Sequence, residues 1–343
     1  MRNAVTARNG PPIELHYLGR VWRIGAPADP IGMTNDRLGV VTPSDAQVSS
    51  TAIGTALIRA AHTRLDPDPL IDDSWADRLV PEFARAAYRD LAVAKLASDS
   101  GAGTMAPEAA LDAMLLAGSG FTNVIMRARY TEDALRDSVA RGTRQYVIIG
   151  AGFDSFALRR PAFAEGVAVF EIDRPATQAL KRRRIEECGQ SIPGSLHFIA
   201  ADLSKQDLVA TLSRSAYRPD RPAFFSWLGV TMFLTREANL ATLRAMAGCS
   251  AAGSELIFTY FDNQIFLSPS ERFRKMQESV RSVGEPFQSG FDSSRLAEDL
   301  RSVGFELIED LAEEELVQRY SRTGKDCMVP MEHSHIALAR VSA

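Results

Sequence analysis

The chain has 343 residues, of which 45% are hydrophobic and 24% charged, and its formal net charge is −4 at pH 7. Such a balance gives no strong positive field, which argues against a nucleic-acid or membrane-surface partner. The length would allow two domains, but apolar residues are spread along the chain and no Ser/Gly linker divides it. We therefore expect a single large domain.

Three widely spaced cysteines, Cys188, Cys249 and Cys327, form no Cys-x-x-Cys pair. This usage suits a reducing cytoplasm and predicts no metal site. The sequence contains no run of about 18 apolar residues and no cleavable leader. We therefore expect a cytoplasmic protein, and the sequence leaves its oligomeric state open.

The first half of the chain contains an arm followed by helices. Residues 1–47 carry many glycines and prolines and no sustained hydrophobic period, which predicts an irregular N-terminal arm. Residues 48–143 show helical periodicity, which predicts a helical cap. The expected helices of this cap span 49–64, 75–97, 107–117 and 123–139.

In residues 144–343, apolar strands alternate with helices. The expected strands span 146–149, 167–172, 196–200, 223–228, 255–260, 305–308 and 335–339. The expected helices span 177–187, 207–213, 237–249, 269–283 and 293–303. Because such alternation builds a sheet with helices on both faces, we predict an α/β fold with a doubly wound, mostly parallel, seven-stranded Rossmann-like sheet. A helical insertion at about 268–292 would follow its fifth strand.

One helix of this half carries the basic run Lys181-Arg-Arg-Arg184. Because Glu186 and Glu187 follow it, we interpret the run as a solvated helix face rather than a nucleic-acid patch.

The most informative motif lies between the first two strands of this half. The apolar run 146–149 leads directly into Gly150-Ala-Gly-Phe-Asp154, and Asp173 closes the next strand. Glycines let the backbone approach a ligand closely, and an acid in that position can accept hydrogen bonds from ribose hydroxyls. The pattern therefore indicates a site for a nucleoside cofactor.

The residues after the glycines favour one cofactor over another. A dinucleotide fingerprint would have a third glycine where this chain has Ser155. The carboxylate of Asp154 would repel a diphosphate but attract the sulfonium and ammonium groups of S-adenosylmethionine. S-adenosylmethionine is thus favoured over NAD(P), the cofactor of the alternative oxidoreductase interpretation. Asp154 and Asp202 could also serve as helix caps.

Five motifs occur in a familiar order. They are Arg127-Ala-Arg-Tyr-Thr-Glu-Asp-Ala-Leu135, Ile149-Gly-Ala-Gly-Phe-Asp154, Phe170-Glu-Ile-Asp-Arg-Pro175, Ala201-Asp-Leu203 and Gly290-Phe-Asp292. Together they resemble the leucine carboxyl methyltransferase-like family of S-adenosylmethionine-dependent O-methyltransferases, including its actinobacterial-type members. The likeness covers roughly residues 48–341 and implies a methyltransferase fold, but it does not name the acceptor.

The resemblance also implies roles for particular residues. Arg129 would pair with the carboxylate of the cofactor's methionine moiety, because a guanidinium fork fits a carboxylate; a solvated surface role is the alternative. The remaining cofactor residues that it implies are Gly150 and Gly152 for the methionine moiety, Asp173 for the ribose, and Asp202 with Leu203 for the adenine.

The fourth strand departs from the family. Members commonly carry a glutamate at its end, where this chain has Leu228. Backbone carbonyls near Gly150 or Trp227 would then receive the cofactor's ammonium group. The Trp227 side chain itself suits core packing as well as a substrate wall.

The expected reaction follows from the chemistry of methyl transfer. A sulfonium already activates its methyl group, and a carboxylate acceptor is ionised at pH 7 and needs no base. No histidine accompanies the cofactor motifs, which favours a carboxylate of a small metabolite or peptide. A hydroxyl or phenol of a natural product is the alternative, with His62 of the cap as the reserve base. The non-enzymatic alternative is a regulator that binds S-adenosylmethionine without turnover. It stays open because Leu228 stands where members of the family commonly have a glutamate.

Overall fold

The apolar runs in the second half of the chain form a buried sheet. Every residue of β3 (Gln145–Ile149) and β7 (Glu255–Phe261) is buried. Strands buried on both faces belong to the middle of a sheet that helices cover on both sides. The computed structural model describes residues 13–17, 20–24, 48–100, 105–203, 205–282, 284–320 and 328–342.

Seven of the described strands form this sheet, in the order β5-β4-β3-β6-β7-β9-β8. The other five are β4 (Ala168–Asp173), β5 (Leu196–Ala200), β6 (Phe224–Trp227), β8 (Phe305–Ala312) and β9 (Ser334–Val341). The pairs among β5, β4, β3, β6 and β7 are parallel, whereas β9 pairs antiparallel with β7 and β8. The predicted doubly wound, mostly parallel sheet is therefore confirmed. The strand order reverses at β3, and ligands of such sheets bind at the carboxyl ends beside this point.

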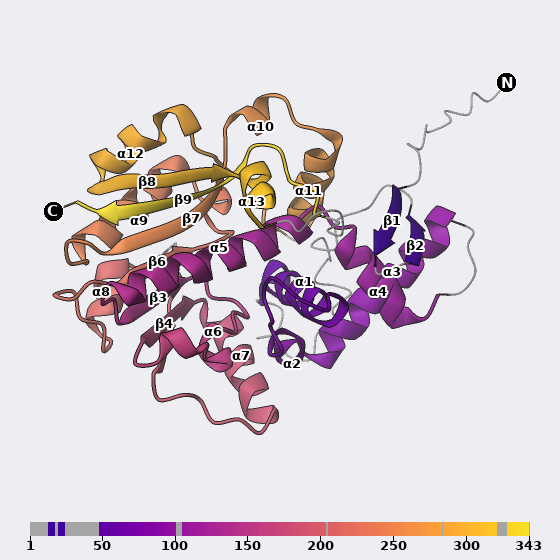
Figure 1. Ribbon diagram of the computed structural model, residues 1–343, viewed down its shortest axis with the longest axis horizontal. Helices are drawn as coiled ribbons and strands as arrows, with labels where there is room; N and C mark the ends of the chain where they lie inside the picture. Colours follow the sequence, from indigo (N-terminus) through magenta and orange to yellow (C-terminus); the bar gives the residue numbers. More distant parts are fainter. Residues whose placement is uncertain are drawn as a thin grey trace.

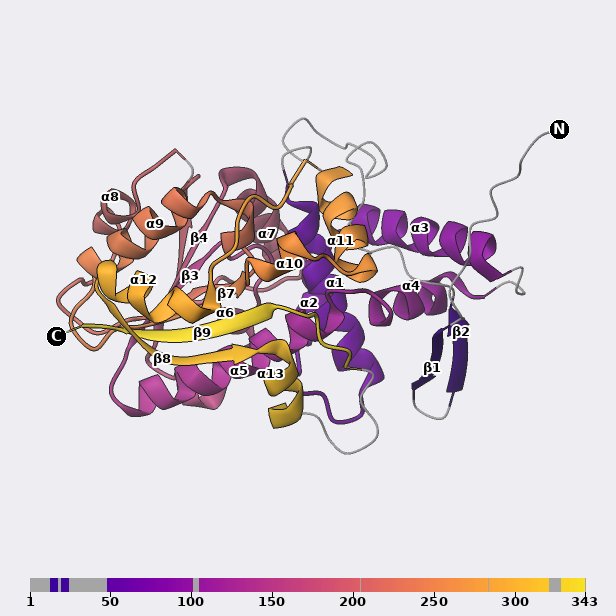
Figure 2. The same ribbon diagram turned by 90° about the horizontal axis from the view of Figure 1, so that it is seen from above.

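Helices cover the two faces of the sheet (Figures 1 and 2). One face is covered by α5 (Phe121–Ala140), α6 (Phe156–Arg159), α7 (Pro175–Glu187) and α13 (Glu313–Tyr320). The other is covered by α8 (Leu208–Ser213), α9 (Arg236–Gly248) and α12 (Leu296–Ser302). Helices α5, α6 and α13 share one hydrophobic core with the sheet, and α8, α9 and α12 share another, whereas the apolar residues of α7 pack in the core of the cap. The sequence did not predict α13, and β8 runs further than the predicted 305–308.

A helical cap lies beyond one end of the sheet (Figure 1). It contains α1 (Ser50–Leu65), α2 (Ala76–Leu79), α3 (Glu82–Ser100) and α4 (Pro107–Leu116). The side chain of Ser49 caps α1 by accepting from the Ala52 N–H. The predicted helix 75–97 is divided at Pro81 into α2 and α3, because the residue before a proline is disfavoured in a helix. The predicted insertion 269–283 forms α11 (Glu271–Ser282), preceded by α10 (Gln264–Leu267).

Part of the N-terminal arm is regular. β1 (Ile13–Tyr17) and β2 (Arg20–Ile24) pair antiparallel as a separate two-stranded sheet. β2 lies against α3 of the cap (Figure 2). The prediction of an irregular arm is therefore wrong for these two strands, whose runs of five residues each carried too little periodicity to be recognised. The rest of 1–47 lies outside the described residues.

Within the described part of the chain, no single helix has both the length and the apolar character needed to cross a membrane. Only α4 and α5 taken together, which are bent by 71° where they meet, satisfy that test by length and composition.

Candidate functional site

The glycine turn lies at the carboxyl end of β3, where the strand order reverses. Gly150 and Gly152 have φ angles of +71° and +51°, in the left-handed region that favours glycine. Space is limited as well. A Cβ atom on Gly150 would lie 2.7 Å from Val230 Cγ2, and one on Gly152 would lie 3.0 Å from Ala52 Cβ. The turn therefore depends on both glycines, and the first turn of α1 packs directly on it.

Asp173 stands at the end of β4, next to this turn. Its Oδ2 accepts a hydrogen bond from the Gly152 N–H, and its Oδ1 accepts one from the Arg174 N–H at 2.6 Å. Burial raises the pKa of Asp173, although both backbone hydrogen bonds oppose the shift. The structure thus brings the predicted acid and the glycine turn together.

Asp154 ends the turn, two residues before α6 begins at Phe156. Its Oδ1 accepts from the Phe156 N–H at 2.8 Å. The N-cap of α6 is Ser155, without a side-chain capping bond, so the N-cap role that the sequence left open for Asp154 is not present. The charge of Asp154 also acts on neighbours: burial raises the pKa of Glu171 to about 7, and Asp154 adds to that shift while Lys181 opposes it.

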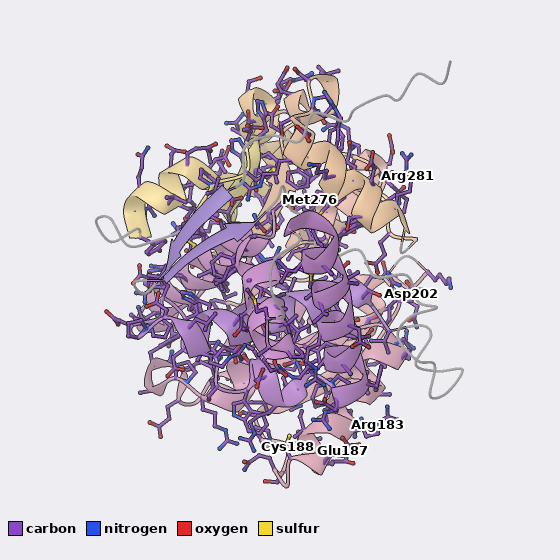
Figure 3. All side chains as sticks on the ribbon, turned by 90° about the vertical axis from the view of Figure 1, so that its right-hand side faces the viewer. Arg183, Glu187, Cys188, Asp202, Met276 and Arg281 are labelled. Carbon is purple, nitrogen blue, oxygen red and sulfur yellow. The ribbon has the colours of Figure 1, made fainter. Side chains whose placement is uncertain are left out.

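Lys181 differs from its prediction. Its ammonium group forms an ion pair with Glu171, and both side chains are 1% exposed. The interpretation of residues 181–184 as a solvated face is wrong for this lysine. Its side chain turns inward from α7 and pairs with Glu171 of β4, which is buried beneath the helix. Arg183 fits the interpretation, since it is exposed and pairs with Glu187 at 3.9 Å near the surface (Figure 3).

Asp202 and Leu203 follow β5. The Asp202 N–H donates to Gln206 Oε1 at 2.9 Å, and the carboxylate pairs with Lys205 at 3.3 Å. Asp202 lies at the rim of the molecule (Figure 3), whereas Leu203 is half-buried against the core on the α9 side. Asp202 and Asp173 therefore follow neighbouring strands, β5 and β4, as the sequence predicted.

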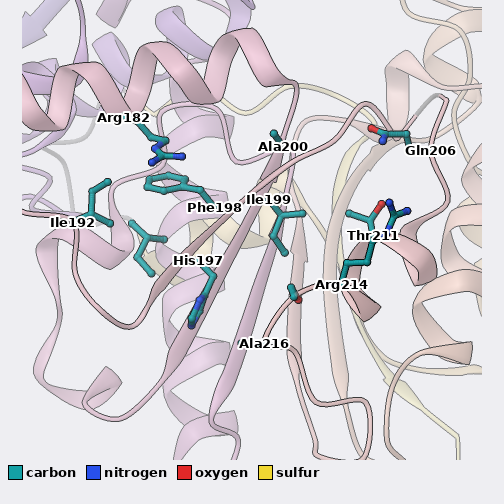
Figure 4. Close-up of a pocket in the computed structure, with 12 residues that line it drawn as sticks. Arg182, Ile192, His197, Phe198, Ile199, Ala200, Gln206, Thr211, Arg214 and Ala216 are labelled. Atoms are coloured by element: carbon teal, nitrogen blue, oxygen red, sulfur yellow. The ribbon is translucent and has the colours of Figure 1, made fainter.

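A groove of about 510 Å³ runs along the outer edge of β5 (Figure 4). Side chains from α7, β5 and α8 line it, among them Arg182, Phe198 and Arg214. It reaches Gln206 beside Asp202, but its lining includes neither Asp173 nor the glycine turn. The groove is therefore distinct from the predicted cofactor site.

Trp227 and Leu228 end β6 with apolar side chains. Trp227 is 1% exposed and packs in the core on the α9 face, so core packing is the role the structure shows for this side chain. Leu228 packs on the opposite face beside Met126 and Tyr130 of α5. Because both side chains pack in or against the core, only the backbone carbonyls of these residues remain to receive the cofactor's ammonium group, which is the contact that the sequence predicts here.

Arg129 does not lie where the sequence predicted. Its Nε pairs with Asp133 Oδ2 at 2.9 Å, its Nη1 donates to the Leu70 carbonyl at 3.3 Å, and its guanidinium lies 5.7 Å from the centre of the Tyr320 ring. The side chain is 34% exposed and has its own counter-ion. The expected role of Arg129 at the cofactor's carboxylate therefore does not fit this geometry, which matches the alternative of a surface arginine.

Arg127 occupies that position instead. Residues two apart on an α-helix point about 200° apart, so these two arginines face opposite ways. A Cβ atom on Gly229 would lie 2.6 Å from Arg127 Nη1, which places this guanidinium at the carboxyl end of β6. Burial and the neighbouring Arg59 lower the pKa of Arg127 to about 10, and the charge of Glu313 opposes this shift. Its one side-chain partner among the described residues is the neutral Asn123.

Arg59 ties the cap to the glycine turn. Its Nη2 donates to the Phe153 carbonyl at 2.7 Å, and its Nε pairs with Asp73 at 2.8 Å. Burial alone would raise the pKa of Asp73, but Arg59 and Arg159 outweigh it and lower that pKa. The sequence alone did not reveal this network, because no local pattern links α1 to a turn nearly a hundred residues away.

His62 is part of the cap's structure. Its side chain is 1% exposed, its Nε2 accepts from the Leu70 N–H at 3.0 Å, and its ring packs edge-on against Phe121. A ring nitrogen that accepts a backbone hydrogen bond in the core cannot also take a proton from an acceptor substrate. The interpretation of His62 as a reserve base is therefore wrong.

Known proteins resemble this chain in sequence and in fold. A family model described as leucine carboxyl methyltransferase matches residues 52–247. YktD of Bacillus subtilis, named as an S-adenosyl-L-methionine-dependent methyltransferase, is 32% identical over 213 residues, which are 62% of this chain and 70% of the relative. A similarly named protein of Mycolicibacterium smegmatis is 30% identical over 237 residues, which are 69% of this chain and 74% of the relative.

A similar solved structure is that of a protein from Thermobifida fusca named as a methyltransferase. It is 14% identical, covers 74% of this chain and 93% of its own, and superposes with a TM-score of 0.51. At this identity the likeness shows the fold alone.

Proposed function

The chain belongs to the leucine carboxyl methyltransferase family of S-adenosylmethionine-dependent methyltransferases, and we propose that it methylates a carboxylate of a small metabolite or peptide. The observation that carries the carboxylate acceptor is that no described histidine is placed to act as a base. Cofactor binding is supported by the half-buried Arg127 guanidinium at the carboxyl end of β6, which forms no ion pair among the described residues.

The residues present fit the cofactor. An unpaired, half-buried cation is costly, so Arg127 is suited to bind the carboxylate of the methionine moiety. Asp173 can accept from the ribose hydroxyls, and Gly150 and Gly152 leave no side chain between the backbone and a ligand. Asp202 would accept from the adenine amino group. Because Leu228 replaces the family glutamate, backbone carbonyls would receive the ammonium group.

The positions of the described histidines favour a carboxylate as the nucleophile, because none of them is placed to act as a general base. Among the histidine side chains that the structure describes, His62 is bonded to Leu70, His197 stacks on Phe170, and His335 stacks on Tyr260. His333 is exposed in the turn before β9. A hydroxyl acceptor would need such a base, whereas a carboxylate is already ionised at pH 7.

An aromatic cluster supports an acceptor with an apolar portion. Phe233 follows the turn after β6 and packs against Phe287, which stacks on the fully buried Phe273 of α11. Phe261, at the end of β7, joins the same cluster. Phe233 lies three residues after Val230, whose side chain stands against the glycine turn, so this cluster is the candidate for an apolar wall of the acceptor site.

When bound, S-adenosylmethionine would supply a methyl group activated by its sulfonium, with the methyl C–S bond broken and S-adenosylhomocysteine as the leaving group. A carboxylate acceptor would need no proton transfer. The protein therefore needs to bind both partners, hold them in line and exclude water. Arg127 and Asp173 would fix the cofactor, and the cap and aromatic cluster would exclude water from the acceptor.

The test uses S-adenosylmethionine labelled on its methyl group and a small-molecule and peptide extract. Methyl esters release labelled methanol in mild base, whereas methyl ethers do not. We expect base-labile label with the wild-type protein and with Arg129→Ala, and little with Arg127→Ala. Base-stable label would replace the carboxylate with a hydroxyl acceptor, and cofactor binding without labelled product from any extract would favour a regulator.

A further inference from the structure

Arg127 is held in place by a neutral side chain. Its Nη1 donates to Asn123 Oδ1 at 3.0 Å, one turn earlier on α5, and it forms no ion pair among the described residues. Most other arginines around the cap and turn have an acidic partner, such as Asp133 for Arg129 and Asp73 for Arg59. A carboxylate at position 123 would have neutralised the guanidinium, so the amide orients Arg127 while leaving its charge for a ligand.

The orientation of Asn123 is itself determined by its surroundings. Its Nδ2 donates to Glu313 Oε2 at 3.1 Å and to Ser334 Oγ at 3.0 Å. An asparagine amide has one donor end and one acceptor end, so with two acceptors at the nitrogen its oxygen must face Arg127. The three partners come from α5, α13 and β9, which are far apart in sequence.

Glu313 is built into the protein at this point. Its side chain is 1% exposed at the first residue of α13, and its Oε1 has no hydrogen-bond partner among the described residues. Burial raises the pKa of Glu313 to about 7, whereas hydrogen bonds from Ser334 and Asn123 and the charge of Arg272 act in the opposite direction. Keeping such a group in the core is costly, which argues that it serves a purpose beyond stability.

We propose that Asn123 and Glu313 are positioning residues that form a charge-sparing clamp, fixing the Arg127 guanidinium against Gly229 without neutralising it. The inference rests on the proposed function, in which Arg127 binds the carboxylate of the cofactor. A guanidinium fixed in advance loses less conformational freedom when it binds, so the clamp strengthens binding of that carboxylate. It contributes nothing to the adenosine end of the cofactor.

The test separates the two ends of the cofactor by calorimetry. S-adenosylhomocysteine carries the amino-acid moiety, whereas 5′-methylthioadenosine lacks it. We expect Asn123→Ala to weaken the binding of S-adenosylhomocysteine by about tenfold, the scale of one charge-assisted hydrogen bond. The affinity for methylthioadenosine should stay unchanged. Asn123→Asp should cause a similar selective loss, because its carboxylate neutralises Arg127 and cannot donate to Glu313. Glu313→Ala should weaken the same ligand by less.

Matched controls are buried polar residues at the opposite end of the sheet. Gln145 begins β3 and bonds to the Arg218 backbone, and Glu255 begins β7 and pairs with Arg141 and Arg340. Gln145→Ala and Glu255→Gln should leave the affinity for both ligands unchanged in the folded protein. Asn123→Ser provides a milder replacement if Asn123→Ala does not fold.

The outcomes distinguish the clamp from the role of Arg127 itself. With Arg127 already replaced by alanine, Asn123→Ala should cause no further loss, because the two residues act as one unit. Equal weakening of both ligands by Asn123→Ala, or wild-type affinity of Asn123→Asp for S-adenosylhomocysteine, would overturn the clamp. If Arg127→Ala leaves S-adenosylhomocysteine binding unchanged, the proposed role of Arg127 fails, and the clamp fails with it.

Discussion

Replacing the two arginines of α5 one at a time gives the most discriminating prediction. Arg127 lies against Gly229, and among the described residues Asn123 is its one side-chain partner, whereas Arg129 pairs with Asp133 and lies by the Tyr320 ring. Because the two side chains point in nearly opposite directions, only Arg127 can reach a carboxylate at the strand ends. We expect Arg127→Ala to lower the affinity for the cofactor and Arg129→Ala to leave that affinity unchanged.

The sizes of the two effects differ clearly. A hydrogen bond to a charged group contributes about 1.5–3 kcal/mol, so Arg127→Ala should raise the Kd for S-adenosylmethionine by roughly 10- to 150-fold. Arg129 and Asp133 are 34% and 25% exposed, which screens their ion pair. Losing that pair should lower the free energy of unfolding by only about 0.2–1 kcal/mol. Arg127→Lys should recover part of the affinity, because an ammonium group keeps the charge but not the planar fork.

Isothermal titration calorimetry with S-adenosylhomocysteine measures these affinities, and thermal unfolding of the same samples shows that each variant is folded. Equal Kd values for Arg127→Ala and the wild type, or a larger loss for Arg129→Ala, would refute the assignment.

Three further predictions concern other residues of the site and the cap. Asp173→Ala should weaken the binding of S-adenosylhomocysteine by about 1.5–3 kcal/mol in calorimetry, and Asp173→Asn should weaken it by less. Unchanged affinity in both variants would mean that the acid only supports the turn. His62→Ala should lower the thermal midpoint, because the Leu70 N–H loses its acceptor, yet leave kcat of the folded protein unchanged; loss of kcat would return His62 to catalysis. Since burial raises the pKa of Glu313 to about 7 from 4.5, this group favours folding below pH 4.5 and loses that contribution as the pH rises through 7. Glu313→Gln should therefore gain thermal midpoint relative to the wild type across this window, and a constant difference from pH 4.5 to 8 would contradict the assigned shift.

The order of elements around the cofactor turn could be predicted from sequence, because each element leaves a local signal there. Buried parallel strands appear in the sequence as apolar runs. Gly150 and Gly152 mark a turn whose φ angles and close contacts disfavour any residue with a side chain. The positions of Asp173 and Asp202 followed from the same rule, because the carboxyl ends of neighbouring parallel strands meet at one edge.

The choice between Arg127 and Arg129 could not be made in that way. Both border the buried stripe of α5, at opposite edges, so helical periodicity treats them alike. The choice depends on how α5 is rotated against β6, which packing across the sheet determines. The role of His62 was equally hidden, because the Leu70 N–H reaches it only after the loop behind α1 folds back. Helix α13 was missed because it is short and follows β8 without a break.

The most direct test of the account is a crystal structure of the protein with S-adenosylhomocysteine. We predict that the carboxylate of the ligand binds the Arg127 guanidinium and that its ribose hydroxyls donate to Asp173. A ligand carboxylate bound by Arg129, or a ligand placed in the groove along β5 away from the glycine turn, would contradict the account.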